Sequence, residues 1–449
     1  MPTYGGRRAC LPLVALVALV VVAGCGPVSG SPPASAEAPA PSLAEITPPP
    51  PTTPPLPAAT SPTQAEVERL LAAVAANPDD AEAQRDLGFA LLQRVRETAD
   101  PSLYDPAEAA FAAARRLAPD DAGVLVGIAG LQLGRHEFAQ ALETGRAAAE
   151  LSPSLASARA VIVDALVELG RYDEADEAAG EMLALSADLS TLARISYLAE
   201  LRGQLDVALG AMRMAAASPG LAPENTAYVE ALLGNLLVYT GDPGGAAAAY
   251  EAALDEVPAH PPSLAGQARL AVGDGRLDEA IALFRRASEI VPLPEYVIAL
   301  GDTQSAAGLT GDAQASFALA RAEIQLFEAS GVVVDLDLAL FEADHGDAAR
   351  ALDLARVAHD ASPTIRAADA VAWALHRLGR DDDAVPYLAE AARLGSRDPI
   401  LRYHAGAIEA ALGDTAAARR DLELAIATDP GFSATGAAEA RRLLAGLPD

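Results

Sequence analysis

A glycine that recurs at intervals of 33 to 38 residues constrains this sequence more than any other feature. Nine glycines share the register: Gly134, Gly170, Gly203, Gly241, Gly275, Gly308, Gly346, Gly379 and Gly413. An alanine stands five residues after each of them, from Ala139 to Ala418. A period of this length is typical of a chain that stacks one supersecondary unit many times.

Other positions of the period indicate that the unit is a hairpin of two helices. A small residue stands seven residues before eight of the nine glycines, with Val163 as the exception. An alanine stands twelve residues after seven of them, and the unit after Gly134 has Arg146 there. Small residues let two antiparallel helices approach where they cross, and a glycine at positive φ ends the first helix cheaply. Larger residues should fill the remaining space: Met212, Tyr250, Phe284, Phe317, Leu388 and Leu422. Prolines should prevent the second helix from continuing: Pro119, Pro153, Pro258, Pro292, Pro363 and Pro430.

This spacing resembles the tetratricopeptide repeat, most clearly from Leu233-Gly234 to Pro258 and from Gly275 to Pro292. The resemblance covers about residues 81–430, and it implies an all-α, right-handed superhelical solenoid of about ten helix-turn-helix units. Gln64–Ala76 and Ala437–Leu447 are expected to be capping helices, because a terminal repeat must cover a bare apolar face. We predict a first part over residues 63–332 and a second over 333–449. The reason is that Arg321–Ser330 lengthens one unit and valines follow it, so a kink or seam near residue 331 is expected.

The resemblance also implies a concave groove, lined by each first helix, that binds a protein or peptide. The groove positions are those six or ten residues before the glycines, with help from those three or thirteen before them. The polar and aromatic residues assigned to the groove at these positions are Tyr197, Tyr228, Asn235, Arg269, Asp302, Arg366, Asp369, Trp373, His376 and Tyr403. Apolar equivalents are Val124, Ile128, Leu336 and Leu340. Trp373 and Tyr403 either contact the ligand or pack between neighbouring repeats, and helical spacing does not separate these alternatives.

The N-terminus has the parts of a secretory signal. Arg7 and Arg8 precede an apolar run, Leu11–Val22, which is too short for a transmembrane helix of about 20 residues. The run ends in Val22-Ala23-Gly24-Cys25, which resembles the lipobox of bacterial lipoproteins. The resemblance implies that residues 1–24 are removed and that Cys25 is lipidated. The protein would then be anchored at the extracytoplasmic face of the cell membrane or outer membrane. The alternatives are an ordinary cleaved signal peptide and an uncleaved anchor.

Residues 25–62 are rich in proline, including Pro48–Pro51, so we expect a disordered, extended tether between the anchor and the solenoid. The formal net charge is −30, and all 32 basic residues are arginine. This charge argues against nucleic acid as a partner and against electrostatic docking on an anionic membrane.

Catalytic signals are weak. No Gly-x-Ser-x-Gly elbow or phosphate-binding loop occurs, and Gln140 stands where His136-Glu137 would need a second histidine to bind zinc. Glu342, Asp344 and His345 form a small acidic cluster, for which ordinary solvation is favoured over metal binding. We therefore expect no catalysis, no cofactor and no metal. The sequence predicts a membrane-anchored scaffold for protein–protein interaction. The alternatives are an assembly lipoprotein for polysaccharide export or outer-membrane biogenesis, and a metal-dependent enzyme using the His345–His404 region.

Overall fold

The computed structural model describes residues 61–218, 220 and 222–448. The described residues form 22 α-helices, one short 3-10 helix and no strand, so the predicted all-α repeat solenoid is confirmed. The predicted signal peptide, Cys25 and all but the last two residues of the predicted tether lie outside the described residues. Within the described part, every helix is too short or too polar to cross a membrane.

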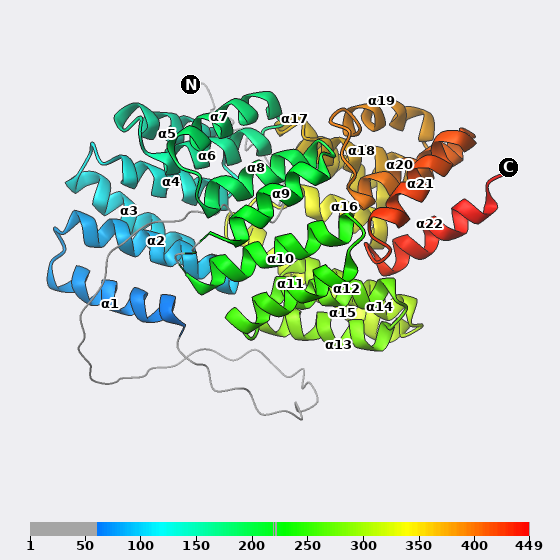
Figure 1. Ribbon diagram of the computed structural model, residues 1–449, viewed down its shortest axis with the longest axis horizontal. Coiled ribbons are helices and arrows are strands. Elements are labelled where there is room, and N and C mark those ends of the chain that lie inside the picture. Colours follow the sequence, from blue (N-terminus) through cyan, green and yellow to red (C-terminus); the bar gives the residue numbers. More distant parts are fainter. Residues whose placement is uncertain (1–60, 219, 221, 449) are drawn as a thin grey trace, which may run out of the picture.

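Twenty of the helices pair into ten antiparallel hairpins (Figure 1). The hairpins are α2 (Ala81–Thr98) with α3 (Tyr104–Leu117), α4 (Ala122–Gly134) with α5 (Phe138–Leu151), α6 (Ala156–Glu168) with α7 (Tyr172–Leu185), α8 (Leu189–Leu201) with α9 (Leu205–Ala216), α10 (Pro223–Tyr239) with α11 (Pro243–Glu256), α12 (Pro261–Gly273) with α13 (Leu277–Ile290), α14 (Pro294–Ala306) with α15 (Thr310–Ala329), α16 (Asp335–His345) with α17 (Ala348–Ala361), α18 (Ile365–Arg377) with α19 (Asp381–Ala391), and α20 (Pro399–Leu412) with α21 (Thr415–Thr428). Single helices cover the two ends, α1 (Pro62–Ala76) and α22 (Ala434–Gly446).

The small residues lie where the two helices of a hairpin cross, as predicted. A Cβ added to Gly301 would lie 2.5 Å from the Phe317 ring, and one added to Gly406 would lie 2.6 Å from Leu422. A Cβ on Gly234 would overlap the ring of Tyr250, which is fully buried. The large residue of the second helix therefore occupies the volume that the glycine leaves empty.

Seven of the nine repeat glycines have positive φ, and the two exceptions correct the predicted register. In the α4–α5 hairpin the left-handed residue is His136, with φ 62°. Ala141 and Ala148, five and twelve residues after it, are fully buried, whereas Ala139 is exposed. The register at Gly134 is thus wrong by two residues, and Ala148 is the closing alanine that was missing at Arg146.

At Gly346 the φ angle is −145°, so a left-handed turn does not explain this glycine. A Cβ there would overlap the Glu342 carboxylate, which accepts a hydrogen bond from the Asp347 amide at 3.0 Å. Glycine at this position therefore makes room for a side chain that caps the following helix.

The segment near residue 331 joins distant parts of the solenoid. Helix α15 is long, as expected, with 20 residues. The valines that follow it are not helical, and Val332 and Val334 are buried in a core shared with Phe111 and Leu131. The carbonyl of Val333 lies 2.9 Å from Nδ1 of His136. The second part of the chain therefore packs against the first part at this segment.

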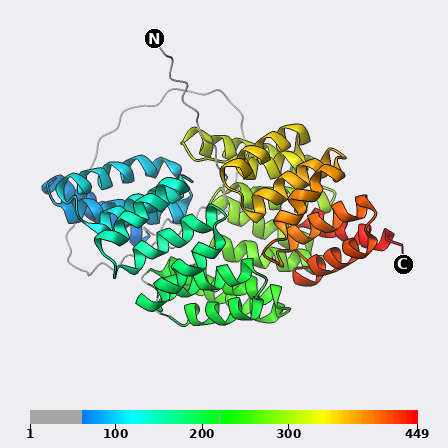
Figure 2. The same cartoon turned by 90° about the horizontal axis from the view of Figure 1, so that it is seen from above.

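Successive turns of the superhelix touch through their interhelical loops. Figure 2 shows the chain running from the N-terminal helices, in blue, through the green helices to the C-terminal helices, in orange and red. The Ile365 amide donates a hydrogen bond to the Tyr172 hydroxyl at 3.1 Å, and Arg393 donates to the Gly170 carbonyl at 3.2 Å. At Gly170 a Cβ would lie 2.5 Å from the Pro363 carbonyl oxygen. The loops of successive turns therefore meet backbone to backbone at this contact.

Replacing Gly301 with alanine should lower the free energy of unfolding by about 1–3 kcal/mol, because the Phe317 ring would have to move. Gly180→Ala is the matched control. Gly180 is an exposed residue of α7 with no atom near its added Cβ, so alanine should stabilise by about 0.5–1 kcal/mol. Chemical denaturation measures both values. A stabilising Gly301→Ala would contradict the crossing geometry.

Gly170→Ala tests the contact between turns, with Gly275→Ala as its control. Both glycines have positive φ, 70° and 75°, but only Gly170 faces another loop. The control should lose about 1–2 kcal/mol from backbone strain alone. Gly170→Ala should lose more and should increase the radius of gyration in small-angle X-ray scattering. Equal losses with unchanged scattering would show that the turns do not need this contact.

Candidate functional site on the inner face

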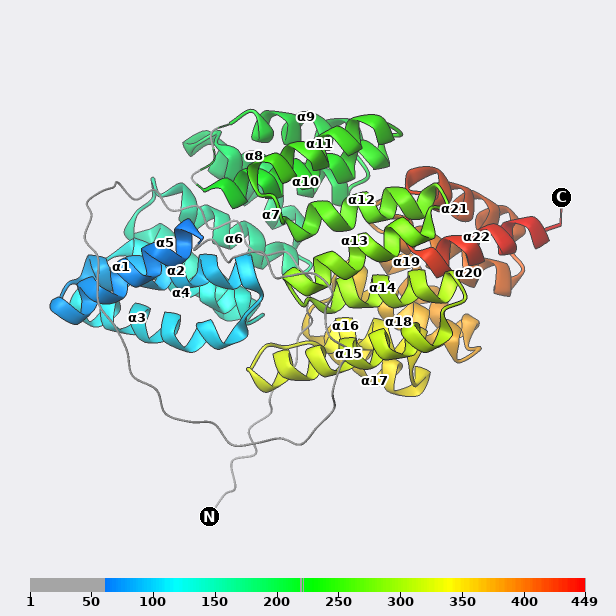
Figure 3. The same cartoon turned by 90° about the horizontal axis from the view of Figure 1, so that it is seen from below.

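Seven successive first helices send ionisable side chains to one region inside the superhelical turn. They are α6, α8, α10, α12, α14, α16 and α18, joined by the turn before α20 (Figure 3). Ten residues, named here the central cluster, each lie close enough to at least one other member to interact electrostatically with it: Glu168, Tyr197, Glu200, Tyr228, Tyr239, Arg269, Glu295, Asp337, Arg366 and Asp398. Because such interactions are short-ranged, helices far apart in sequence must face each other here.

The central cluster remains accessible to solvent. Glu168 is 8% exposed, Glu295 is exposed, and the other eight side chains are partly exposed. A core packed for stability alone would bury apolar side chains instead. The inner face therefore presents polar groups that a ligand could reach.

Most of the carboxylates have no partner. Glu168 and Glu200 accept no hydrogen bond and pair with no guanidinium among the residues that the structure describes. Burial raises the pKa of Glu168 to about 7, against the opposing effect of Arg366. Burial also raises the pKa of Glu200 to about 7, and the charge of Asp398 adds to the shift. Oδ2 of Asp337 is buried without a hydrogen-bond donor.

The two arginines of the cluster differ in how they are held. Arg269 donates a hydrogen bond to Oδ1 of Asn235, which also accepts one from the Tyr250 hydroxyl at 2.8 Å. Arg366 makes no hydrogen bond or ion pair within the described part of the chain. Burial alone would lower the pKa of Arg366, but Asp398, Tyr197 and the neighbouring carboxylates raise it, so the guanidinium stays charged.

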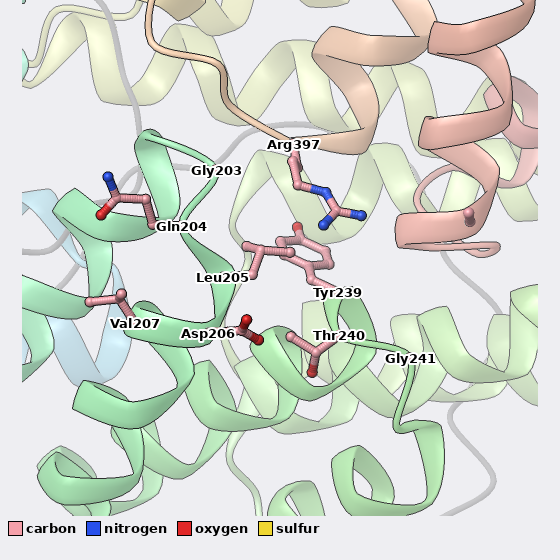
Figure 4. A pocket seen from close by; sticks show the side chains of 10 residues that line it. Gly203, Gln204, Leu205, Asp206, Val207, Tyr239, Thr240, Gly241 and Arg397 are labelled. Carbon is pink, nitrogen blue, oxygen red and sulfur yellow. The ribbon is translucent and has the colours of Figure 1, made fainter.

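A hollow of about 450 Å³ adjoins the cluster at the contact between turns. It is lined by Gly203–Val207, Tyr239–Gly241, Arg397 and Ala427. Figure 4 shows the Arg397 guanidinium pointing toward Tyr239 and Leu205. Tyr239 belongs to both the hollow and the central cluster, so the hollow borders the cluster.

The structure divides the ten predicted groove residues into two groups. Tyr197, Tyr228, Arg269 and Arg366 belong to the central cluster, and Asn235 contacts it through Arg269. The other five, Asp302, Asp369, Trp373, His376 and Tyr403, lie together among the C-terminal hairpins. The spacing rule therefore found the inner face of the middle hairpins, but it did not find one continuous groove.

The C-terminal group is packed against protein. Trp373 is 2% exposed, its ring stacks on His404 at 4.0 Å, and its Nε1 donates to Asp344 at 2.8 Å. Tyr403 is 8% exposed. Of the two alternatives for Trp373 and Tyr403, packing between repeats is the one that the structure shows. The remaining three each face a neighbour: Asp369 is hydrogen-bonded to His404 at 2.8 Å and His376 to Asp381 at 2.5 Å, and Oδ1 of Asp302 lies 3.3 Å from Nε2 of His345. Two apolar groove positions, Val124 and Leu336, are also buried.

Sequence reasoning missed most of the acidic half of the site. Glu200 and Glu295 stand three and thirteen residues before their glycines, at positions that the groove rule names but with residues that it did not select. Glu168 and Tyr239 stand two residues before theirs, outside the rule. Glu168, Glu200 and Tyr239 share one signal, a polar residue in the last turn of a first helix, whereas Glu295 lies in the first turn of α14.

The residues considered for metal binding have other partners. Glu342 accepts hydrogen bonds from Arg350 and from the Asp347 amide, and Asp344 accepts one from Trp373. His345 stacks on Phe317 with ring centroids 4.0 Å apart. Across residues 61–448, apart from 219 and 221, no three His, Cys, Asp or Glu side chains are arranged to hold a metal ion.

Residues 232–292 match the family model of the tetratricopeptide repeat, so the predicted resemblance is confirmed over that segment. The sequence matches no curated protein. Among solved structures, the chain is similar to YrrB, a tetratricopeptide-repeat protein with a peptide-binding site. The identity is 20%, over 40% of this chain and 92% of that one, with a TM-score of 0.29.

PilF of Pseudomonas aeruginosa shows 20% identity over 44% of this chain and 89% of its own, with a TM-score of 0.38. Human IFIT1 shows 15% identity over 74% of this chain and 78% of its own, with a TM-score of 0.46. These structures are too distant to carry an argument about function. The fold assignment therefore rests on the ten hairpins and on the family match.

The raised pKa values of the cluster predict that the protein loses stability as the pH rises. The pKa of Glu168 and Glu200 is about 7 in the folded protein, above the ordinary 4.5, so the folded chain holds more protons between these values. The stability that these two side chains contribute is fully present below pH 4.5 and is lost as the pH rises through 7. Glu168→Gln should therefore raise the free energy of unfolding at pH 8 by about 1–3 kcal/mol, and change it little at pH 4.

Glu177→Gln is the control for this measurement, because Glu177 is an exposed residue of the neighbouring helix α7. Thermal and chemical denaturation across the pH range would give both curves. A difference between Glu168→Gln and wild type that does not depend on pH would contradict the assignment.

Proposed function

We propose that this chain is a scaffold that holds a segment of another protein on the inner face of its superhelix. The observation that carries the proposal is the convergence of accessible polar side chains from seven successive first helices on one region. Side chains from so many repeats offer many modest contacts in a row, which suits an extended segment better than a compact small molecule.

The family match supports this function. The matched segment, residues 232–292, contains Tyr239 and Arg269, so part of the central cluster lies on repeats that the family model identifies. The central cluster consists of carboxylates, guanidiniums and phenols. It contains no serine or cysteine beside a histidine base, the arrangement that activates those nucleophiles, which favours binding over catalysis. We therefore propose that the protein is not an enzyme.

We further propose that the scaffold is a lipoprotein on the extracytoplasmic side of the cell envelope, attached through Cys25. The support is the sequence Val22-Ala23-Gly24-Cys25 after a short apolar run that follows two arginines. In this proposal the proline-rich residues 25–62 connect the lipid to α1, where the folded body begins. The lipid supplies the membrane contact that the acidic body would not make by charge.

The binding surface can be tested by photo-crosslinking. A benzophenone amino acid at Tyr197 or Tyr228 should label the same partner in the native envelope. The same group at Tyr387, on the second helix α19, should not. In the control, as in the test positions, the benzophenone amino acid replaces a tyrosine. The positions therefore differ only in whether they lie on a first or a second helix. Cross-links from Tyr387 alone would place the partner on the outer helices and contradict the proposal.

The anchor can be tested by metabolic labelling with palmitate in the native host. Cys25→Ala should abolish the label and release the protein from the membrane fraction, because the thioether sulfur would be lost. Cys10→Ala should keep the palmitate label and the membrane association. It is a matched control because Cys10 and Cys25 are the two cysteines of the sequence. Membrane association of unlabelled Cys25→Ala would favour an uncleaved anchor instead.

A further inference from the structure

We infer that the segment held on the inner face is basic, and that its arginine or lysine side chains bind the carboxylates of the central cluster. This inference rests on the proposed function and names the chemistry of its partner.

The first argument is the balance of charge. The cluster has five carboxyl groups and two guanidiniums, so its formal charge is −3 when all are ionised. Asp398 caps α20 by accepting from the Ile400 amide at 2.8 Å. The other four carboxylates form no ion pair within the described residues. A cationic ligand would supply the missing positive charge, whereas an anionic one would add to the repulsion.

The second argument is that deep carboxylates stand without partners. Glu168 is more than nine-tenths buried and accepts no hydrogen bond among the described residues. The buried Oδ2 of Asp337 also lacks a donor, and these two carboxylates interact with each other and with Arg366. An unpaired buried carboxylate is costly, so groups of this kind are commonly completed by a partner. Arg366 does not supply that partner, since it forms no ion pair with either of them.

The third argument is that tyrosines of this solenoid, one on the first helix α10 and one on the second helix α7, already hold arginines of the chain. The Arg96 guanidinium lies 5.5 Å from the ring centroid of Tyr228 and donates to Glu224 at 3.0 Å. Arg393 lies in the same way over Tyr172, at 5.3 Å. Each guanidinium is held by a tyrosine face, and Arg96 is also held by a carboxylate. Tyr197 and Tyr239 lie among the unpaired carboxylates and offer the same combination to a side chain from outside.

The arrangement favours an extended chain of cations over a single ion. The carboxylates come from four different helices, α6, α8, α14 and α16, and no three of the acidic or histidine side chains in the described part could hold one metal ion. Several guanidinium or ammonium groups, spaced along a peptide, can reach several carboxylates at once. The flexible stems of arginine and lysine can also lie along the tyrosine rings.

The test uses a fluorescent dodecapeptide in which arginine alternates with serine, added to the purified folded chain at 150 mM salt. A peptide in which glutamate replaces arginine is the ligand control.

The double variant Glu168→Gln/Glu200→Gln should weaken binding of the arginine peptide at least tenfold. Glu177→Gln/Glu251→Gln removes the same charge from exposed positions on the second helices α7 and α11, and it should weaken binding less than twofold. Arg366→Gln should strengthen binding several-fold, because it removes the repulsion between the Arg366 guanidinium and the arginines of the peptide. Loss of folding is not expected in the first variant, since it removes carboxylates that burial already penalises.

Three results would overturn the inference. Equal losses in the two double variants would show that only the overall negative charge attracts the peptide. Displacement of the peptide by an equal concentration of spermidine would point to a small-cation site. Equal binding of the glutamate peptide would show that charge does not select the ligand. In each case a partner cross-linked through Tyr197 would leave the proposed function intact, so the two failures can be told apart.

Discussion

The close approach of two helices over a residue without a side chain is the constraint on which the rest of this structure depends. Phe111 lies against both Gly88 and Gly127, and Tyr250 lies against Gly234 and Gly266. Each ring thus fills space in its own hairpin and in the next one. Because interiors are close-packed, a shared ring couples the crossing of one hairpin to the stacking of its neighbour. The repeat therefore builds a solenoid of defined curvature.

That curvature brings loops about 190 residues apart into contact. Gly170 meets Pro363, and Gly203 meets Gly395, with carbonyl oxygens in the space that a side chain would need. The turn closes on its inner helices, which places Glu168 and Arg366 in one region although 198 positions separate them. The polar centre is thus a product of closure. Burial raises the pKa of Glu168, Glu200 and Asp337, and these three carboxylates form no ion pair within the described residues.

Local rules predicted the elements well and the site only in part. The ten hairpins and a single helix at each end follow from patterns within about 35 residues, and the structure confirms them. The turn at His136 was misplaced because Gly134 offered a glycine at nearly the expected distance, whereas the backbone uses a left-handed histidine that bonds to Val333. Trp373 fitted the groove rule, yet the hairpin around α20 covers it through His404. The partner of His136 is almost 200 residues away, and the partner of Trp373 lies in the next hairpin. A rule confined to one repeat contains neither partner.

The sequence by itself determined the repeating unit, because glycine, alanine and proline act on the backbone and on helix crossing within a single hairpin. The resemblance to the tetratricopeptide repeat implied that each first helix faces inward, and the groove residues predicted on that basis included Tyr197, Tyr228, Arg269 and Arg366. Only the tertiary structure decided that these residues share one region with Glu168, Glu200 and Asp337, and that the carboxylates lack partners there. The physical reason is that curvature is a small rotation repeated at every hairpin. The total rotation over many hairpins decides which distant helices meet, and it depends on all the packing contacts together.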